Sequence, residues 1–146
     1  MANLIEKINA EMENITVVLR ELEKVKDKPN KTNLELAGIA TYLHNFYMGI
    51  ENILKQIVIS KRIPIPSTET WHRDLLMIAT NKGVITEHTQ KQLAKYLAFR
   101  HFFTHAYGFL LDEAKLKPLV DNVFEMYILF KKEIDDTLSK DVGEQK

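Results

Sequence analysis

Apolar residues spaced three or four positions apart run through nearly the whole chain, and this spacing constrains the fold most. It places the apolar side chains of each segment on one face of an α-helix. No segment alternates apolar and polar residues as a half-buried strand does. The sequence therefore predicts an all-α protein. In the first segment the stripe consists of Leu4, Ile8, Met12, Ile15, Leu19, Leu22 and Val25.

A second helix is expected to start after Thr32, which has Glu35 three residues later, the spacing of a capping box. Its apolar stripe continues to about Ser60. Gly38 and Gly49 lie within this helix and favour a close approach to another helix. One interpretation is that this approach occurs across a dimer interface. The stripe consists of Leu36, Ile39, Ala40, Leu43, Tyr47, Ile50, Leu54 and Ile57.

Two prolines in Ile63-Pro64-Ile65-Pro66 exclude a helix there, so a stiff connection is expected. A short third helix, capped by Ser67 or Thr68, should cover 69–81 and stop at Gly83. A fourth should run from a Thr86 cap to Gly108, and a last one from between 112 and 118, with a frayed tail at 140–146. These expectations give one domain, 1–146, folded as a four- to five-helix up-and-down bundle.

The composition narrows the protein class. The 146 residues contain no cysteine, which excludes disulfides and cysteine-based catalysis and fits a cytoplasmic protein. No segment is apolar for long enough to span a bilayer, and the N-terminus is not a secretory signal. Twenty basic residues balance twenty acidic ones, so an anionic partner must be held by a local patch.

The most unusual stretch is 98–108, which carries the pattern R-x-x-x-x-H-x-Y with Arg100, His105 and Tyr107 among phenylalanine and alanine residues. Polar groups at such positions are costly unless they are paired or used at a cleft. On an ideal helix Arg100 and His105 lie about 140° apart. They can act together only if the helix breaks near Thr104 or if a second copy supplies another His105. Otherwise the stretch is a packed helix end with a capped imidazole.

The chemistry of these side chains suits the cleavage of RNA. Imidazole, with a pKa of about 6.5, can remove the proton of the ribose 2′-hydroxyl or protonate the leaving 5′-oxygen. A guanidinium can hold the phosphate and its developing charge, so Arg100 takes that role. Glu69-x-x-His72 matches a di-iron helix motif once, whereas such a site needs it twice, so no metal is expected. Lys91 and Lys95 could extend a basic path for RNA or form a solvated face.

Together with Trp71-His72-Arg73-Asp74-Leu75-Leu76, the stretch Arg100–Gly108 resembles the HepT-like branch of the HEPN superfamily. The resemblance implies a homodimeric, metal-independent endoribonuclease toxin of a type VII-like toxin–antitoxin system, which needs no cofactor and cuts tRNA in preference to mRNA. It also implies Arg100 and His105 as the catalytic pair. His101 and Thr104 are expected to support them, although many HEPN proteins have Asn or Asp where His101 stands.

The resemblance further implies a partner, a minimal nucleotidyltransferase (MNT) antitoxin that uses ATP to adenylylate Tyr107. Trp71, His72 and Arg73 then line the cleft or contact this partner, or they serve in packing alone. One alternative is a HEPN subunit that binds a nucleotidyltransferase without cutting RNA. Another is a helical interaction domain unrelated to RNA, which would make the motif match accidental.

Overall fold

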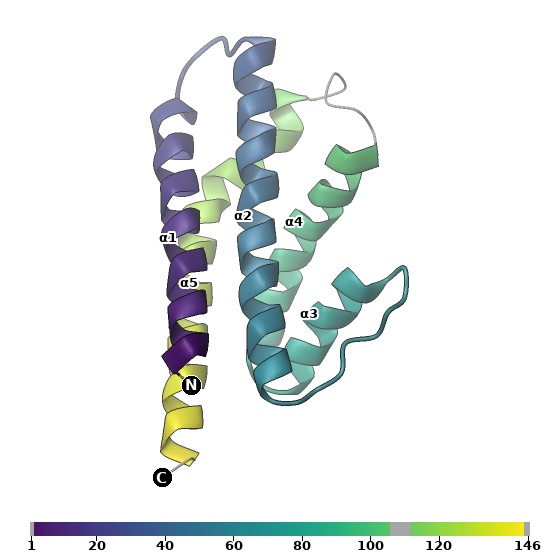
Figure 1. Ribbon diagram of the computed structural model, residues 1–146. Coiled ribbons are helices and arrows are strands. Elements are labelled where there is room, and N and C mark those ends of the chain that lie inside the picture. Colours follow the sequence, from purple (N-terminus) through teal and green to yellow (C-terminus); the bar gives the residue numbers. More distant parts are fainter. Residues whose placement is uncertain (1, 106–111, 145–146) are drawn as a thin grey trace.

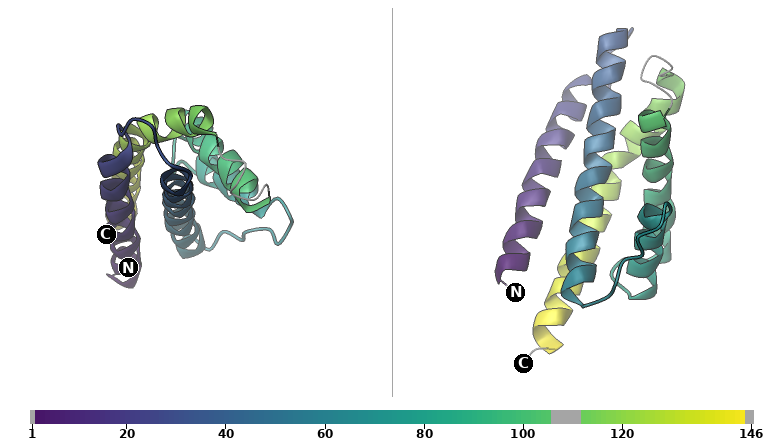
Figure 2. Two further views of the ribbon diagram at one scale, coloured as in Figure 1. Left: turned by 90° about the horizontal axis from the view of Figure 1, so that it is seen from above. Right: turned by 45° about the vertical axis from the view of Figure 1, so that its right-hand side comes forward.

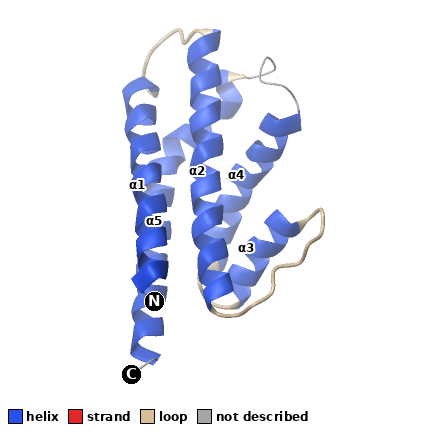
Figure 3. Ribbon diagram, in the orientation of Figure 1, coloured by secondary structure: helices blue, strands red, loops and turns tan. Residues whose placement is uncertain are grey.

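The computed structural model describes residues 2–105 and 112–144, and these residues form helices and their connections with no strand among them (Figure 3). Of the five helices in this part of the chain, four are long and α3 is short. Figure 1 shows that the long helices alternate in direction along the chain and that α3 lies at their side. The expected all-α bundle is confirmed. The helices are α1 (Ala2–Val25), α2 (Asn33–Ser60), α3 (Trp71–Asn81), α4 (Glu87–His105) and α5 (Glu113–Glu144).

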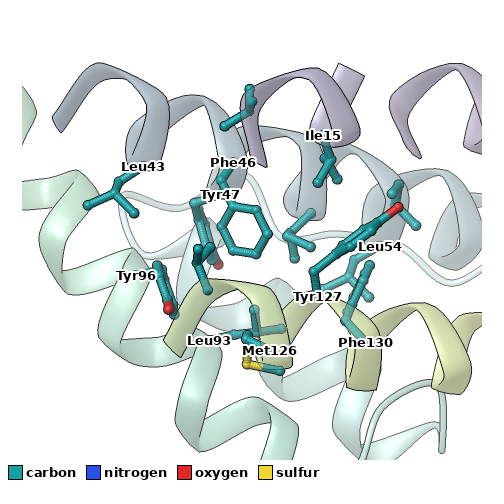
Figure 4. Close-up of a cluster of buried hydrophobic side chains, with 14 of the residues drawn as sticks. Ile15, Leu43, Phe46, Tyr47, Leu54, Leu93, Tyr96, Met126, Tyr127 and Phe130 are labelled. Atoms are coloured by element: carbon teal, nitrogen blue, oxygen red, sulfur yellow. The ribbon is translucent and has the colours of Figure 1, made fainter. Parts of the chain in front are cut away.

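α2 is the central helix, because it contacts each of the other four. The two views of Figure 2 show α1 on one side of it and α3 and α4 on the other, while α5 crosses behind it from the side of α4 to the side of α1. The core is built around its apolar stripe, and Figure 4 shows Phe46 and Tyr47 of α2 among side chains of α1, α4 and α5. Both aromatic side chains are at most 1% exposed. Within the described residues, none of the helices is both long and apolar enough to cross a bilayer.

Local sequence signals account for most helix ends. Thr32 and Glu35 form the expected capping box of α2, in which each side chain accepts a hydrogen bond from the other residue's backbone N–H. The Thr86 hydroxyl accepts from the Thr89 N–H at the start of α4. Gly83, after α3, has a φ of 76°, which glycine adopts at little cost.

The start of α3 differs from the expectation. The helix begins at Trp71, two residues later than expected, and neither Ser67 nor Thr68 caps it. Thr70 is the N-terminal flanking residue, but its side chain makes no capping bond. The hydroxyls of Thr68 and Thr70 instead donate to Asp74 Oδ2, each at 3.1 Å, which leaves the segment before Trp71 in an irregular turn.

α5 also differs in two details. Pro118 lies in its second turn rather than its first, and the helix starts after Asp112, whose carboxylate accepts from the Ala114 N–H at 2.9 Å. The helix continues through 140 to Glu144, further than the expected fraying point. The Lys61 ammonium donates to Asp141 at 2.7 Å, which ties this last part of α5 to the end of α2.

Candidate functional site

Arg100 lies in the last two turns of α4 and is partly buried. Its Nε is buried and has no hydrogen-bond partner among the described residues. No ion pair within residues 2–105 and 112–144 includes the Arg100 guanidinium. A buried donor without a partner is costly, so its presence calls for an explanation, and a bound ion is one. Arg100 therefore has the properties of an anion-binding group.

The motif lies on a continuous helix up to His105. The Thr104 hydroxyl lies 3.0 Å from the Arg100 carbonyl oxygen and 3.1 Å from that of His101, so it bonds back to its own helix. Of the two alternatives, a helix break near Thr104 or a second copy of the chain, the break is not seen up to His105. Along an unbroken helix, Arg100 and His105 leave the axis about 140° apart. A single copy of the chain therefore does not bring these two residues onto one helix face.

The remaining motif residues can be placed only in part. The His105 backbone ends α4, while its side chain and all of Tyr107 lie outside the described residues. His101 is exposed. The neighbouring phenylalanines pack inward: Phe99, just before the motif arginine, is 9% exposed and packs on Phe103, with ring centroids 6.0 Å apart. The apolar part of the motif thus anchors the end of α4 in the core.

His44 is a site residue that the sequence analysis missed. Its ring lies 5.2 Å from that of Phe103, and its Nδ1 is buried without a hydrogen-bond partner among the described residues. Burial and the neighbouring positive charge of Arg100 lower the pKa of His44 below its usual 6.5, against the opposing effect of Glu51. A neutral imidazole on α2 therefore faces the motif near pH 7.

Glu51 is a second missed residue, one of the few buried charged groups at 6% exposure. Its Oε2 accepts a hydrogen bond from His72 Nδ1 at 2.6 Å, which joins α2 to the first turn of α3. His44, Tyr47 and Glu51 follow each other at spacings of three and four, so they share one face of α2. His44 and Glu51 are polar residues on this face of α2, and their spacing in the sequence was the signal that could have identified them.

The segment that begins α3 is packed rather than open. Trp71 is partly buried and stacks on His72 with ring centroids 3.7 Å apart, and the Lys55 ammonium lies 5.3 Å from the Trp71 ring centroid. Arg73 is exposed. A surface pocket of about 360 Å³ lies beside this cluster and is lined by Lys55, Ile65, Pro66, Ser67, Thr68 and Trp71. Of the three residues expected at a cleft, Trp71 lines a pocket, His72 is held by Glu51, and Arg73 faces solvent.

The charged groups elsewhere do not extend the site. Lys91 and Lys95 are exposed on α4 and contact neighbours on their own helix, Glu87 at 3.4 Å and Gln92 at 3.3 Å. Another pocket, of about 210 Å³, lies between the segment after α1, the first turns of α2 and the start of α5; Arg100 does not line it, and its Lys31 is paired with Glu113. Among the described residues, no three or more His, Asp or Glu side chains gather as metal ligands would.

Comparisons with known proteins agree with this architecture. The sequence model of a family described as HepT-like protein matches residues 38–140, which include most of α2, all of α3 and α4, and most of α5. A solved structure described as the cytosolic protein of unknown function YutE from Bacillus subtilis shares the fold with a TM-score of 0.77, at 18% identity over 94% of this chain and 92% of that one. No match was found among curated proteins. The chain belongs to the HepT-like family of the HEPN superfamily.

Proposed function

We propose that this protein is an endoribonuclease toxin that acts as a homodimer and needs no metal ion. The observation that carries the proposal is the Arg100 guanidinium, which lies at the end of α4, five residues before His105, without an ion-pair partner among the described residues. A planar guanidinium binds a phosphate through two parallel hydrogen bonds. Its position in a HepT-like chain makes an RNA phosphate the expected ligand.

Cleavage requires a base and an acid. A neutral imidazole removes the proton of the ribose 2′-hydroxyl, the 2′-oxygen attacks the adjacent phosphorus, and an imidazolium protonates the departing 5′-oxygen. Arg100 stabilises the added negative charge on the phosphorus oxygens. Because α4 does not bring Arg100 and His105 to one face, two copies of the chain would combine the arginine of one with the histidine of the other. Two copies also supply two His105 side chains.

The expected substrate is tRNA in preference to mRNA, and this part rests on the family resemblance alone. The decisive experiment compares wild-type protein with His105→Ala and Arg100→Lys on purified tRNA and mRNA in the presence of EDTA. We expect cleavage by wild type and a loss of about 10²-fold or more in both variants, since each removes a group that acts in the transition state. Arg20→Lys, an exposed arginine on α1, is the matched control. Equal cleavage by His105→Ala would contradict the catalytic role.

Regulation would act on Tyr107. An AMP group attached two residues after His105 adds negative charge and bulk, which repel the RNA phosphate. We expect the intact mass of His105→Ala protein to rise by one or more AMP units when it is incubated with ATP and a cognate MNT-type nucleotidyltransferase. Tyr107→Phe should show no gain. A gain in Tyr107→Phe would move the modification to another residue, and no gain combined with no RNA cleavage would favour a non-catalytic HEPN subunit.

A further inference from the structure

The opposite charges of Glu51 and Arg100 both act on two side chains of α2, Tyr47 and His44. Glu51 and Arg100 nevertheless form no ion pair with each other. The negative charge of Glu51 adds to burial in raising the pKa of Tyr47, while Arg100 acts to lower it. The same two charges act in the same directions on His44, whose pKa Arg100 lowers and Glu51 raises. Ring contacts support this placement: His44 lies 5.2 Å from Phe103 and Phe46 lies 5.3 Å from Tyr96, so Arg100, between these two α4 positions, lies beside this stretch of α2. No ion pair joins Glu51 and Arg100 in the described part of the chain.

Electrostatic attraction alone would lead us to expect an ion pair between Glu51 and Arg100. Opposite charges attract most strongly where water is excluded, and a guanidinium is the best partner for a carboxylate. Glu51 is 6% exposed and Arg100 Nε is buried without a partner, so both would gain from pairing. Something must therefore satisfy Glu51 better than Arg100 does.

The group that satisfies Glu51 is His72. Its Nδ1 lies 2.6 Å from the Glu51 carboxylate, and an ionised carboxylate only accepts, so the imidazole donates. The ring is fixed in place by the Trp71 stack at 3.7 Å, in the first turn of α3. His72 thus arrives from a different helix than Arg100 and holds the carboxylate from that side.

We propose that His72 is a positioning residue: by engaging Glu51, it keeps the Arg100 guanidinium unpaired and available to bind a phosphate. The proposal rests on the proposed function, since the phosphate is that of the RNA. It gives the Trp71-His72 segment a role that is neither direct substrate contact nor packing alone. Without His72, Glu51 becomes a buried carboxylate without a partner and attracts Arg100.

The first test is a double-mutant cycle on RNA cleavage. In His72→Ala we expect KM for RNA to rise by about tenfold or more, the loss expected when a charge-assisted contact is withdrawn. In Glu51→Gln/His72→Ala the competing carboxylate is gone, so KM should return to within about threefold of wild type. If His72 serves only to hold α3 in place, the double variant will be as impaired as His72→Ala, and the proposal is overturned.

The second test reads Arg100 directly and does not need RNA. The chain has only four arginines, Arg20, Arg62, Arg73 and Arg100, so the ¹⁵Nε–¹Hε signal of Arg100 can be assigned by its absence in Arg100→Lys. In His72→Ala this signal should shift and its exchange with water should slow, because the Nε–H gains the Glu51 carboxylate. Both changes should disappear in the double variant. An unchanged signal in His72→Ala would refute the proposal even if wild-type protein cuts no RNA.

Two further variants separate a specific effect from unfolding. His72→Asn keeps a side-chain N–H donor close to the position of Nδ1, so it should retain the wild-type KM and Arg100 signal. His88→Ala removes an exposed histidine of α4 and should change neither readout. If His72→Ala does not fold, the single variant Glu51→Gln tests the proposal instead. Its KM for RNA should be equal to or lower than that of wild type. A tenfold rise of this KM would overturn the proposal.

Discussion

At the scale of single residues, His44 links the stability of the protein to pH. Its pKa is lowered in the folded state by burial and by Arg100, whereas in the unfolded chain it returns to about 6.5. As pH falls through that value, the unfolded chain binds a proton that the folded protein resists, so the free energy of unfolding decreases. The contribution of neutral His44 to the free energy of unfolding is therefore fully present above pH 6.5. It is lost as the pH falls from 6.5 toward the lower pKa that His44 has in the folded protein.

We therefore expect urea unfolding to show a smaller loss of stability between pH 7.5 and 5.5 in His44→Asn than in wild type. His88→Asn, which changes an exposed imidazole, should keep the wild-type slope. The groups that face His44 and titrate or carry charge, Glu51, Tyr47 and Arg100, stay the same in all three proteins. Identical slopes in wild type and His44→Asn would show that this imidazole does not resist protonation.

At the scale of elements, the two glycines of α2 have different environments. A Cβ on Gly49 would lie 2.7 Å from Ile15 Cγ1 on α1, too close for real atoms, so α1 and α2 pack tightly there. A Cβ on Gly38 would have no atom of this chain within 4 Å among the described residues. The close approach expected from both glycines is therefore seen within the chain at Gly49 alone.

The two alanine variants should change stability in opposite directions. Gly49→Ala should lower the free energy of unfolding by about 1–2 kcal/mol, because overpacking outweighs the gain in helix propensity. Gly38→Ala should raise it by about 0.5–1 kcal/mol, since alanine is preferred at an open helical position. Both values come from denaturant titration. A loss of stability in Gly38→Ala would instead indicate that a second copy of the chain covers this face.

At the scale of the whole molecule, the proposed site depends on the assembly of two copies. Arg100 and His105 leave an unbroken helix about 140° apart, so we expect Arg100 from one copy to act with His105 from another. Light scattering should give the mass of a dimer, twice that of the 17.0 kDa chain.

Mixing inactive variants tests this arrangement. Arg100→Ala and His105→Ala are each expected to be inactive alone, but a heterodimer of the two contains one intact arginine and one intact histidine in different chains. After unfolding and refolding together, the mixture should regain more activity than either variant has alone, but less than about a quarter of that of wild type. Half of the dimers are mixed, and each joins an intact arginine of one chain to an intact histidine of the other while lacking the second His105. Activity no higher than that of the separate variants would contradict the pairing of Arg100 and His105 across two chains.

The sequence by itself determined the helices, because apolar periodicity, the Thr32 capping box, the Thr86 cap and Gly83 act through neighbours a few residues away. It also singled out Arg100, since a local motif carries that signal. Only the tertiary structure decided what surrounds Arg100. Glu51, His72 and His44 come from other parts of the chain, and their contacts depend on how α2, α3 and α4 pack. Long-range pairing of buried polar groups leaves little trace in local sequence patterns. For this reason His44, Glu51 and the contact between His72 and Glu51 became visible only in the folded chain.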